Sequence, residues 1–179
     1  EGEKKTKVIT DEVIDSLICF INGYTSVKKL DLTWYGGEPL MAFNKIKQII
    51  HKINDECNVE ISSQSIITNA YLLSDNVIRD MMNLGFTQVQ ISFDGDEESH
   101  DKTRFLKGNK GKTFAKIIGN LDNLVSQTPD DFKIDLRINV NKTNEKDFAI
   151  LYKKFIHRYG TKKINPYPGF IRETSKDGC

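Results

Sequence analysis

The stretch that decides the fold runs Leu30-Asp31-Leu32-Thr33-Trp34-Tyr35-Gly36-Gly37-Glu38-Pro39-Leu40. Its first half alternates apolar and polar residues with the period of two that is typical of a half-buried strand. Two adjacent glycines interrupt that strand, and after one glutamate comes a proline, whose fixed φ suits the first turn of a helix. Glycines in such a turn let main-chain groups approach a small ligand closely. The stretch therefore predicts a strand, an open loop and a helix start.

Single strands and amphipathic helices alternate along the rest of the chain. Apolar residues with helical spacing predict helices over about 11–21, 43–53, 75–84, 114–125 and 148–159, with Thr10 and Ser74 as N-caps. Alternating apolar residues predict strands over about 61–68, 89–93, 134–140 and 163–167, and a polar loop is expected over 95–112. Because no hairpin interrupts this order, we predict one α/β domain over residues 1–179 with a parallel sheet.

Composition limits the classes of partner. The chain has 179 residues, 38% of them hydrophobic and 28% charged, which are the values of an ordinary soluble protein. Its net charge of +1 gives no reason to expect nucleic acid or an anionic membrane as partner. No apolar run approaches the ~20 residues of a membrane span, and the first residues do not resemble a signal peptide. A cytoplasmic protein is the simplest expectation.

The three cysteines, Cys19, Cys57 and Cys179, do not form a recognisable set. Their odd number, without a signal peptide, argues against a disulfide framework. No two of them have the spacing of metal ligands. We expect Cys19 and Cys57 to be ordinary thiols.

Polar or glycine residues stand at the ends of four predicted strands, at 35–39, 68–69, 92–95 and 137–141. In parallel βα architectures, ligands bind at the carboxyl ends of the strands. A simpler interpretation is that strands end in turns, which favour Asn, Asp, Ser and Gly in any case. The convergence of four such ends predicts a pocket at this edge of the sheet.

The Gly-Gly-Glu-Pro stretch resembles the second-strand motif of radical S-adenosylmethionine (SAM) enzymes. The branch it resembles modifies peptides and proteins: the anaerobic sulfatase-maturating enzymes and the ribosomal-peptide maturases. Further matches follow in order over about residues 30–125: Thr68-Asn69-Ala70, Ser92-Phe93-Asp94-Gly95, His100-Asp101-Lys102-Thr103-Arg104 and Lys110-Gly111-Lys112-Thr113-Phe114. The resemblance implies a partial parallel (β/α)6 TIM-like barrel, of which this chain would supply strands two to six and lack strand one.

The resemblance also implies a cofactor site. It assigns the SAM amino group to the loop residues Gly36, Gly37, Glu38 and Pro39, which offer acceptors for an ammonium. It assigns the ribose hydroxyls to Ser92 with Thr68 or Asn69, and the SAM carboxylate to Arg104. Asp94 is the candidate catalytic residue, which would orient substrate or take part in proton transfer.

The chain departs from the family in its cysteines. Radical SAM enzymes hold a [4Fe–4S] cluster with three cysteines, usually Cys-x-x-x-Cys-x-x-Cys, after strand one. None of the three cysteines here has that spacing, so the chain is expected to be the central piece of a longer protein and inactive alone. The whole enzyme would cleave SAM to a 5′-deoxyadenosyl radical and modify a peptide or protein substrate. A flavodoxin or ferredoxin would supply the electron.

Two alternatives remain open on the residues alone. One is a barrel without a cluster that acts only as a peptide- or SAM-binding module. The other is an aldolase-like barrel with a phosphate-binding rim, although no strand-end lysine suited to Schiff-base chemistry is evident. Cysteines encoded upstream of Glu1 would distinguish the first alternative from an enzyme.

Overall fold

Helices and strands alternate in the computed structural model, which describes residues 8–106, 111–142 and 144–170. The elements are α1 (Asp11–Gly23), β1 (Lys29–Trp34), the short 3-10 helix η1 (Pro39–Ala42), α2 (Phe43–Glu56), β2 (Glu60–Thr68), α3 (Asp75–Asn83), β3 (Gln88–Phe93), α4 (Glu97–Thr103), α5 (Phe114–Gln127), β4 (Lys133–Val140), α6 (Glu145–Tyr159) and β5 (Ile164–Phe170). The predicted alternation is confirmed. One prediction was wrong: helix α4 lies inside the segment 95–112 that was expected to be a loop.

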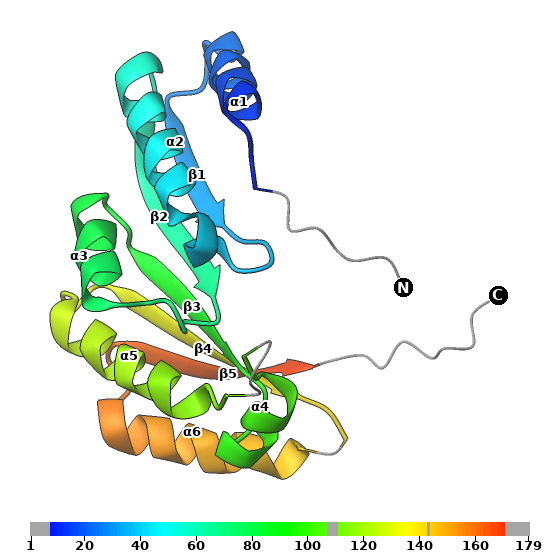
Figure 1. Cartoon of the computed structure of the whole chain (residues 1–179). Helices are drawn as coiled ribbons and strands as arrows, with labels where there is room; N and C mark the ends of the chain where they lie inside the picture. The colour runs from blue at the N-terminus through cyan, green and yellow to red at the C-terminus, as the bar shows by residue number, and fades with distance from the viewer. Residues whose placement is uncertain (1–7, 107–110, 143, 171–179) are drawn as a thin grey trace, which may run out of the picture.

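The sheet is parallel throughout, with strand order β1-β2-β3-β4-β5. Helices α2, α3, α5 and α6 lie on one side of it, and its other side faces away from them (Figure 1). In the described residues β5 does not pair with β1, so the sheet is an open part of a barrel. This confirms the predicted α/β fold with a partial barrel of parallel strands.

The hydrophobic core lies between the sheet and the outer helices. In β3 and β4 every second residue points into it, including Ile91, Phe93 and Leu136, all with no exposed surface. A smaller apolar cluster joins α1 to α2 through Ile14, Ile18, Ile49 and Ile53, and Leu30 and Leu32 of β1 pack against it. The core therefore covers the face of the sheet that is turned towards the helices. The opposite, inner face of the sheet does not take part in this core.

The inner face of the sheet is polar. Tyr167 on β5 donates its hydroxyl to Oε1 of Gln90 on β3 over 2.8 Å. Gln88 on β3 donates to Asp135 on β4 over 2.6 Å. Because these side chains alternate with the core residues along each strand, the two faces have opposite character. The inner face is thus a hydrogen-bonded wall and not a second core.

The helix caps follow the expectation only in part. Thr10 and Ser74 are the N-cap residues of α1 and α3, as predicted, but neither side chain forms a capping hydrogen bond. Their backbone carbonyls accept the first helical bonds instead, from Ile14 over 3.1 Å and from Ile78 over 2.9 Å. The side chain of Asp96, which caps α4 by accepting from the backbone of Ser99 over 3.0 Å, is a true N-cap.

Asn120 on α5 holds the loop that follows β2. Its side-chain amide donates to the carbonyl oxygens of Ala70 over 2.7 Å and Tyr71 over 3.1 Å. We expect Asn120→Asp, which keeps the shape but loses the donor, to lower the free energy of unfolding by about 2 kcal/mol. Urea unfolding measures the change, and Asn120→Gln is the control that restores a donor. An unchanged midpoint for Asn120→Asp would show that these bonds add nothing to stability.

Candidate functional site

Glu38 is the centre of the loop after β1. Its Oε1 accepts hydrogen bonds from the hydroxyl of Thr68 over 2.6 Å and from the backbone of Leu40 over 3.1 Å. Its Oε2 accepts from the backbone N–H of Asn69 over 2.8 Å. A carboxylate offers about four acceptor positions, so one remains for a ligand. Glu38 therefore ties the loop after β1 to the end of β2 and keeps one acceptor position without a protein donor among the described residues.

Thr68 and Asn69 have different relations to this loop. Thr68 is 3% exposed, and its hydroxyl is used by Glu38 and by the backbone of Ala70, 3.0 Å away. Asn69 accepts the N–H of Tyr71 with Oδ1 over 2.9 Å, while its side-chain amide nitrogen has no hydrogen bond in the described residues. Thr68 and Asn69 were the two alternatives predicted to reach the SAM ribose together with Ser92. Of these two, Asn69 has a side-chain amide nitrogen that is not used within the described residues.

Ala70 has a φ of 58°, in the left-handed region that favours glycine. The radical SAM motif that Thr68-Asn69-Ala70 resembles usually has glycine at this position, and the backbone of Ala70 has a conformation that glycine adopts readily. In this turn the backbone N–H of Asn69 donates to Glu38. The backbone N–H of Tyr71 donates to the side chain of Asn69. The substitution of alanine is accommodated without loss of the loop.

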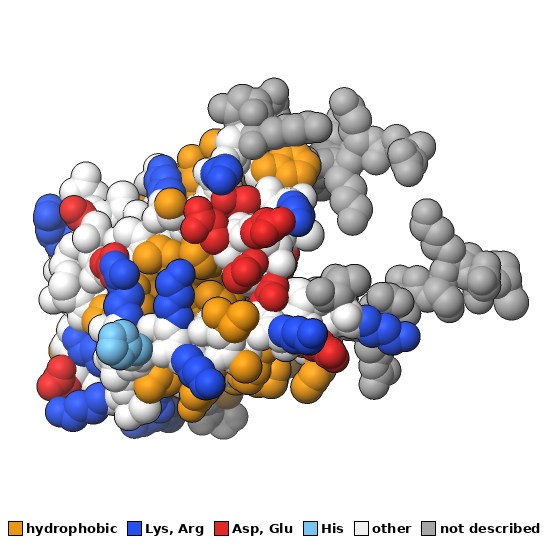
Figure 2. Space-filling model, turned by 90° about the horizontal axis from the view of Figure 1, so that it is seen from below, with side chains coloured by type: hydrophobic (Ala, Val, Ile, Leu, Met, Phe, Trp, Pro, Cys, Tyr) orange, Lys and Arg blue, Asp and Glu red, His pale blue; other side chains and the backbone are white. Residues whose placement is uncertain are grey.

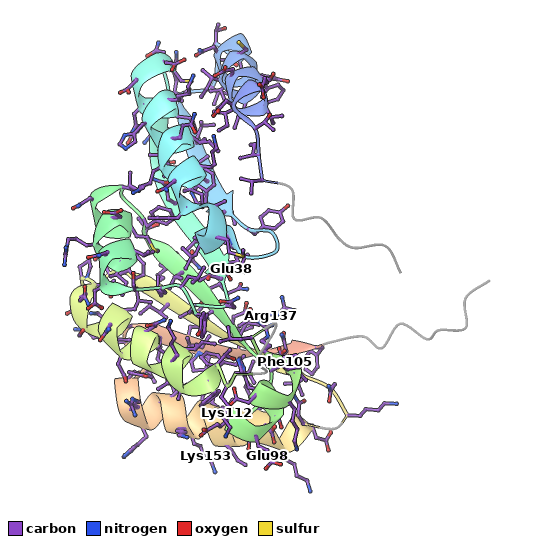
Figure 3. All side chains as sticks on the ribbon, in the orientation of Figure 1. Glu38, Glu98, Phe105, Lys112, Arg137 and Lys153 are labelled. Carbon is purple, nitrogen blue, oxygen red and sulfur yellow. The ribbon has the colours of Figure 1, made fainter. Side chains whose placement is uncertain are left out.

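A cavity of about 550 Å³ lies beside this loop and brings three predicted residues together: Glu38, Asn69 and Arg104. The rest of its lining is mostly apolar and includes Met41, Tyr71, Leu72, Phe105 and Ile117. Glu38 and Phe105 are labelled in Figure 3, one after β1 and the other after α4. A mostly apolar cavity with a few convergent polar groups is the usual form of a small-molecule site.

Gly36 and Gly37 are exposed at the tip of the loop. A Cβ at either position would meet no atom within 4 Å, so packing inside the protein does not require glycine there. The bare backbone is available to a ligand on that side. Pro39 begins η1 directly behind Glu38, as the proline was predicted to begin a helix.

Asp94 follows β3 and is held by three side chains. Arg104 donates from Nε over 2.7 Å, Asn139 donates over 2.7 Å and Thr103 donates over 3.2 Å. Burial raises the pKa of Asp94, but the hydrogen bonds from Arg104 and Asn139 outweigh burial and hold the pKa below its usual value of 3.8. Asp94 is therefore a carboxylate at neutral pH, and it is well suited to positioning other groups.

The arrangement of Asp94 bears on two predicted roles. Arg104, expected to bind the SAM carboxylate, uses its Nε for Asp94, although it also lines the cavity beside Glu38. Asp94 itself opens on a neighbouring polar cavity of about 290 Å³ with Asn139, Asn141 and Asn144. The role of Asp94 in proton transfer stays a prediction. Asn139 was not among the predicted site residues, and only its place at a strand end signalled it.

His100 is fully buried below Asp94. Its ring lies 5.8 Å from that of Phe93 and 5.5 Å from that of Phe114, and its Nδ1 accepts the backbone N–H of Asp94 over 3.2 Å. Its Nε2 has no hydrogen-bond partner among the described residues. Burial, together with the charge of Arg104, lowers the pKa of His100 from 6.5 to about 4. His100 is thus a neutral support for the Asp94 turn and not a solvated loop residue.

Ser92 lies on the inner face of β3, in register with Arg137 on β4. Its hydroxyl has no hydrogen bond in the described residues. Gly95, two residues beyond Phe93, has a φ of 92°, and a Cβ there would lie 2.6 Å from Oδ2 of Asp147 on α6. The Ser-Phe-Asp-Gly sequence therefore places one free hydroxyl on the inner wall and needs glycine to turn.

A second depression lies on the outer surface. It has a volume of about 610 Å³ between α4 and α6 and is lined by acidic residues of α4, such as Glu97 and Glu98, and by Lys154. Figure 2 shows acidic side chains gathered beside lysines and hydrophobic side chains on this face. It lies outside the sheet, away from the carboxyl ends of β1 and β2, and shares no lining residue with the cavity beside Glu38.

No three His, Cys, Asp or Glu side chains in the described part of the chain come together as metal ligands. Cys19 is exposed and Cys57 half-buried, and both are free thiols; burial raises the pKa of Cys57. Cys179 lies outside the described residues. The residues present here thus fit no iron–sulfur cluster. Within the same described ranges, no helix has both the length and the apolar character needed to cross a bilayer.

The parallel half-barrel and its cavity at the carboxyl ends of the strands define an α/β protein of the partial-barrel class. The pattern of the radical SAM superfamily matches residues 10–155, and the chain belongs to that superfamily. Its members use SAM and a [4Fe–4S] cluster. Uncharacterized protein MJ0907 of Methanocaldococcus jannaschii is 33% identical over 94 residues, which are 51% of this chain and 31% of that protein.

Solved structures show the same fold. Native anSMEcpe with bound AdoMet has a TM-score of 0.74 at 19% identity, over 92% of this chain and 44% of that one. The complex of anSMEcpe with AdoMet and the Kp18Cys peptide has a TM-score of 0.73 at 21% identity, over 98% and 48%. HydG, a maturase of the [FeFe]-hydrogenase, has a TM-score of 0.65 at 14% identity, over 97% and 39%. The chain spans less than half of each.

Proposed function

We propose that residues 1–179 form the SAM-binding barrel of a radical SAM enzyme that modifies a peptide or protein. The observation that carries the proposal is the geometry of Glu38: its carboxylate has three protein donors and one remaining acceptor position beside the exposed backbone of Gly36 and Gly37. An ammonium group needs such acceptors. Membership of the superfamily and the peptide-bound state of a structural neighbour support the same function.

In this function the chain binds and orients SAM. The SAM amino group would contact Glu38 and the glycine backbone, and the adenosine part would lie along the cavity towards Asn69. Ser92 offers a hydroxyl donor and acceptor from the inner wall. The chemistry that SAM would supply is cleavage of its sulfonium S–C5′ bond on one-electron reduction, which gives methionine and a 5′-deoxyadenosyl radical able to abstract hydrogen from substrate. Asp94 would hold Arg104 at the rim of the cavity.

The cluster cysteines would be encoded outside residues 1–179, and the chain alone would then be inactive. An electron donor such as a flavodoxin or ferredoxin would act on the longer protein. The described residues contain no set of ligands for the cluster. Their proposed role is therefore limited to binding and orienting SAM and substrate.

The first test is a titration of the chain with SAM, in which the backbone NMR signals of Gly36, Gly37 and Asn69 are monitored. We expect these signals to shift and saturate, and those of Gly119 on α5 to stay unchanged. A matched titration with S-methylthioadenosine, which lacks the amino acid part, should leave the glycine signals in place. Absence of any saturable shift with SAM would contradict a SAM site at this loop.

The second test concerns activity and uses the native gene. We expect codons upstream of Glu1 to encode Cys-x-x-x-Cys-x-x-Cys, and the longer protein, reconstituted with iron and sulfide without oxygen, to release 5′-deoxyadenosine. A start codon in place of the triplet, with SAM still bound by the chain, would leave a binding module instead of an enzyme.

A further inference from the structure

Arg137 is a cation on the inner wall of the barrel. It lies on β4, in register with Ser92 on β3 and Tyr167 on β5. Its neighbours along the strand, Leu136 and Ile138, are buried in the core, so Arg137 belongs to the opposite, inner face. Figure 3 labels Arg137 at the sheet. The side chain thus faces the interior of the half-barrel.

This guanidinium has no anionic partner among the described residues. Asp135, the nearest carboxylate along the same face of β4, is held by Gln88 over 2.6 Å and by Asn165 over 2.9 Å instead. Nε of Arg137 is buried and has no hydrogen-bond partner in the part of the chain that the structure describes. Buried donors are almost always paired, and a charged group left unpaired is costly. An arginine kept in this state on a polar wall indicates a partner that is not part of the described chain.

The fold makes room for this side chain. A Cβ at Gly169 on β5 would collide with Nε of Arg137 and would lie 2.9 Å from Oδ1 of Asn139. Glycine is therefore required at position 169 for the guanidinium to lie across β5. Tyr167, the register partner of Arg137 on β5, donates its hydroxyl to Gln90. The absence of a side chain at Gly169 thus leaves space for the Arg137 side chain on the inner face of β5.

The partner is not the SAM carboxylate. The proposed site of the SAM amino group lies after β1, and β4 is three strands away in the sheet. At about 4.8 Å per strand, that separation is about 14 Å along the wall. The amino and carboxylate groups of SAM are bound to the same carbon atom. Arg104 lines the cavity beside Glu38 and Arg137 does not, so a SAM molecule held at Glu38 would have its carboxylate closer to Arg104 than to Arg137.

We propose that Arg137 binds a carboxylate of the peptide substrate inside the half-barrel, and so selects an acidic substrate. The inference rests on the proposed function, because it assumes that the interior receives a peptide. The planar guanidinium with five donors matches a carboxylate in two parallel hydrogen bonds. The carboxylate comes either from an Asp or Glu side chain or from the end of a peptide chain.

The test compares short peptides that differ in one group. The probes are acetyl-Gly-Ala-Glu-Ala-Gly-amide, the same peptide with Gln for Glu, and the Gln peptide with a free terminal carboxylate. Binding to the chain and to each variant is measured by titration calorimetry, and in the native chain the ¹⁵N signal of Arg137 Nε shows whether the guanidinium is the group that is bound. We expect one of the two carboxylate peptides to bind about tenfold tighter than the neutral peptide. Which of them does so identifies the source of the carboxylate.

Three variants locate the effect. In Arg137→Gln the preference for the carboxylate should disappear, and in Arg137→Lys, which keeps the charge but not the fork, it should fall to about threefold. In Gly169→Ala the preference should also fall, although the arginine remains. Equal affinity for all three peptides in the native chain, or a preference that survives Arg137→Gln, overturns the inference.

A SAM titration of the same samples separates this inference from the proposed function. The affinity for SAM should stay within about twofold in Arg137→Gln. If SAM does not bind the native chain, the proposed function fails whatever the peptides do. If SAM binding is lost only in Arg137→Gln, the arginine belongs to the cofactor site and the assignment to substrate is wrong.

Discussion

Glu38→Ala is expected to lower the free energy of unfolding by about 3 kcal/mol and to abolish SAM binding. The substitution leaves three donors without an acceptor: the hydroxyl of Thr68, which is buried, and the backbone N–H groups of Leu40 and Asn69. Each hydrogen bond to a charged group contributes about 1.5–3 kcal/mol, and water reaching the loop recovers part of the loss. Urea unfolding and a SAM titration measure the two effects.

Two controls accompany this variant. Glu60→Ala removes a glutamate at the start of β2 whose partner Lys29 is also exposed, and it should change stability by no more than about 0.5 kcal/mol. Glu38→Gln keeps the shape and one acceptor oxygen, but its amide nitrogen must face a donor of the loop. It should therefore be intermediate in stability. A Glu38→Ala chain with native stability would show that the loop does not depend on this carboxylate.

The second large effect is a loss of stability in mild acid that depends on His100. Its pKa is about 4 in the folded chain, against an ordinary value of 6.5, because the ring is buried among Phe93 and Phe114 and lies near Arg104. Between these values the unfolded chain binds the proton and the folded chain does not. Stability is therefore complete above pH 6.5 and falls as the pH drops towards 4, by up to about 3 kcal/mol.

The measurement is the free energy of unfolding from urea curves at several pH values between 4 and 7. His100→Phe removes the titrating group and keeps a ring in the cage, so its curve should lose most of this slope, although it also loses the acceptor for the Asp94 backbone. His51→Gln, on an exposed position of α2, should keep the native slope. A His100→Phe curve as steep as the native one would assign the acid sensitivity to other groups.

The sequence patterns were sufficient for the architecture. The spacing of apolar residues located every strand within a few residues, because a parallel sheet buried under helices needs regular alternation. Four strand ends with polar residues predicted the edge where Glu38, Asn69 and Arg104 now line one cavity. These features depend on local sequence and on general rules of βα packing, so they can be predicted from a single sequence.

What the patterns missed depends on three-dimensional contacts. Helix α4 was interpreted as a loop because its seven residues have no apolar stripe, although Asp96 and the two acidic residues after it were a recognisable helix start. The burial of His100 requires Phe93 and Phe114 to meet it from two other elements. The use of Thr68 by Glu38 likewise depends on the approach of two loops.

Arg104 connects two neighbouring cavities: it lines the one beside Glu38, and its Nε donates to Asp94, which lines the other. A ligand that recruits this guanidinium on one side changes the charge that a second ligand meets on the other. By thermodynamic linkage the effect is reciprocal: each ligand alters the affinity of the other by the same factor. Binding in one cavity would thus change the affinity of the other cavity for its ligand. Titrating each ligand in the presence of the other measures that cooperativity.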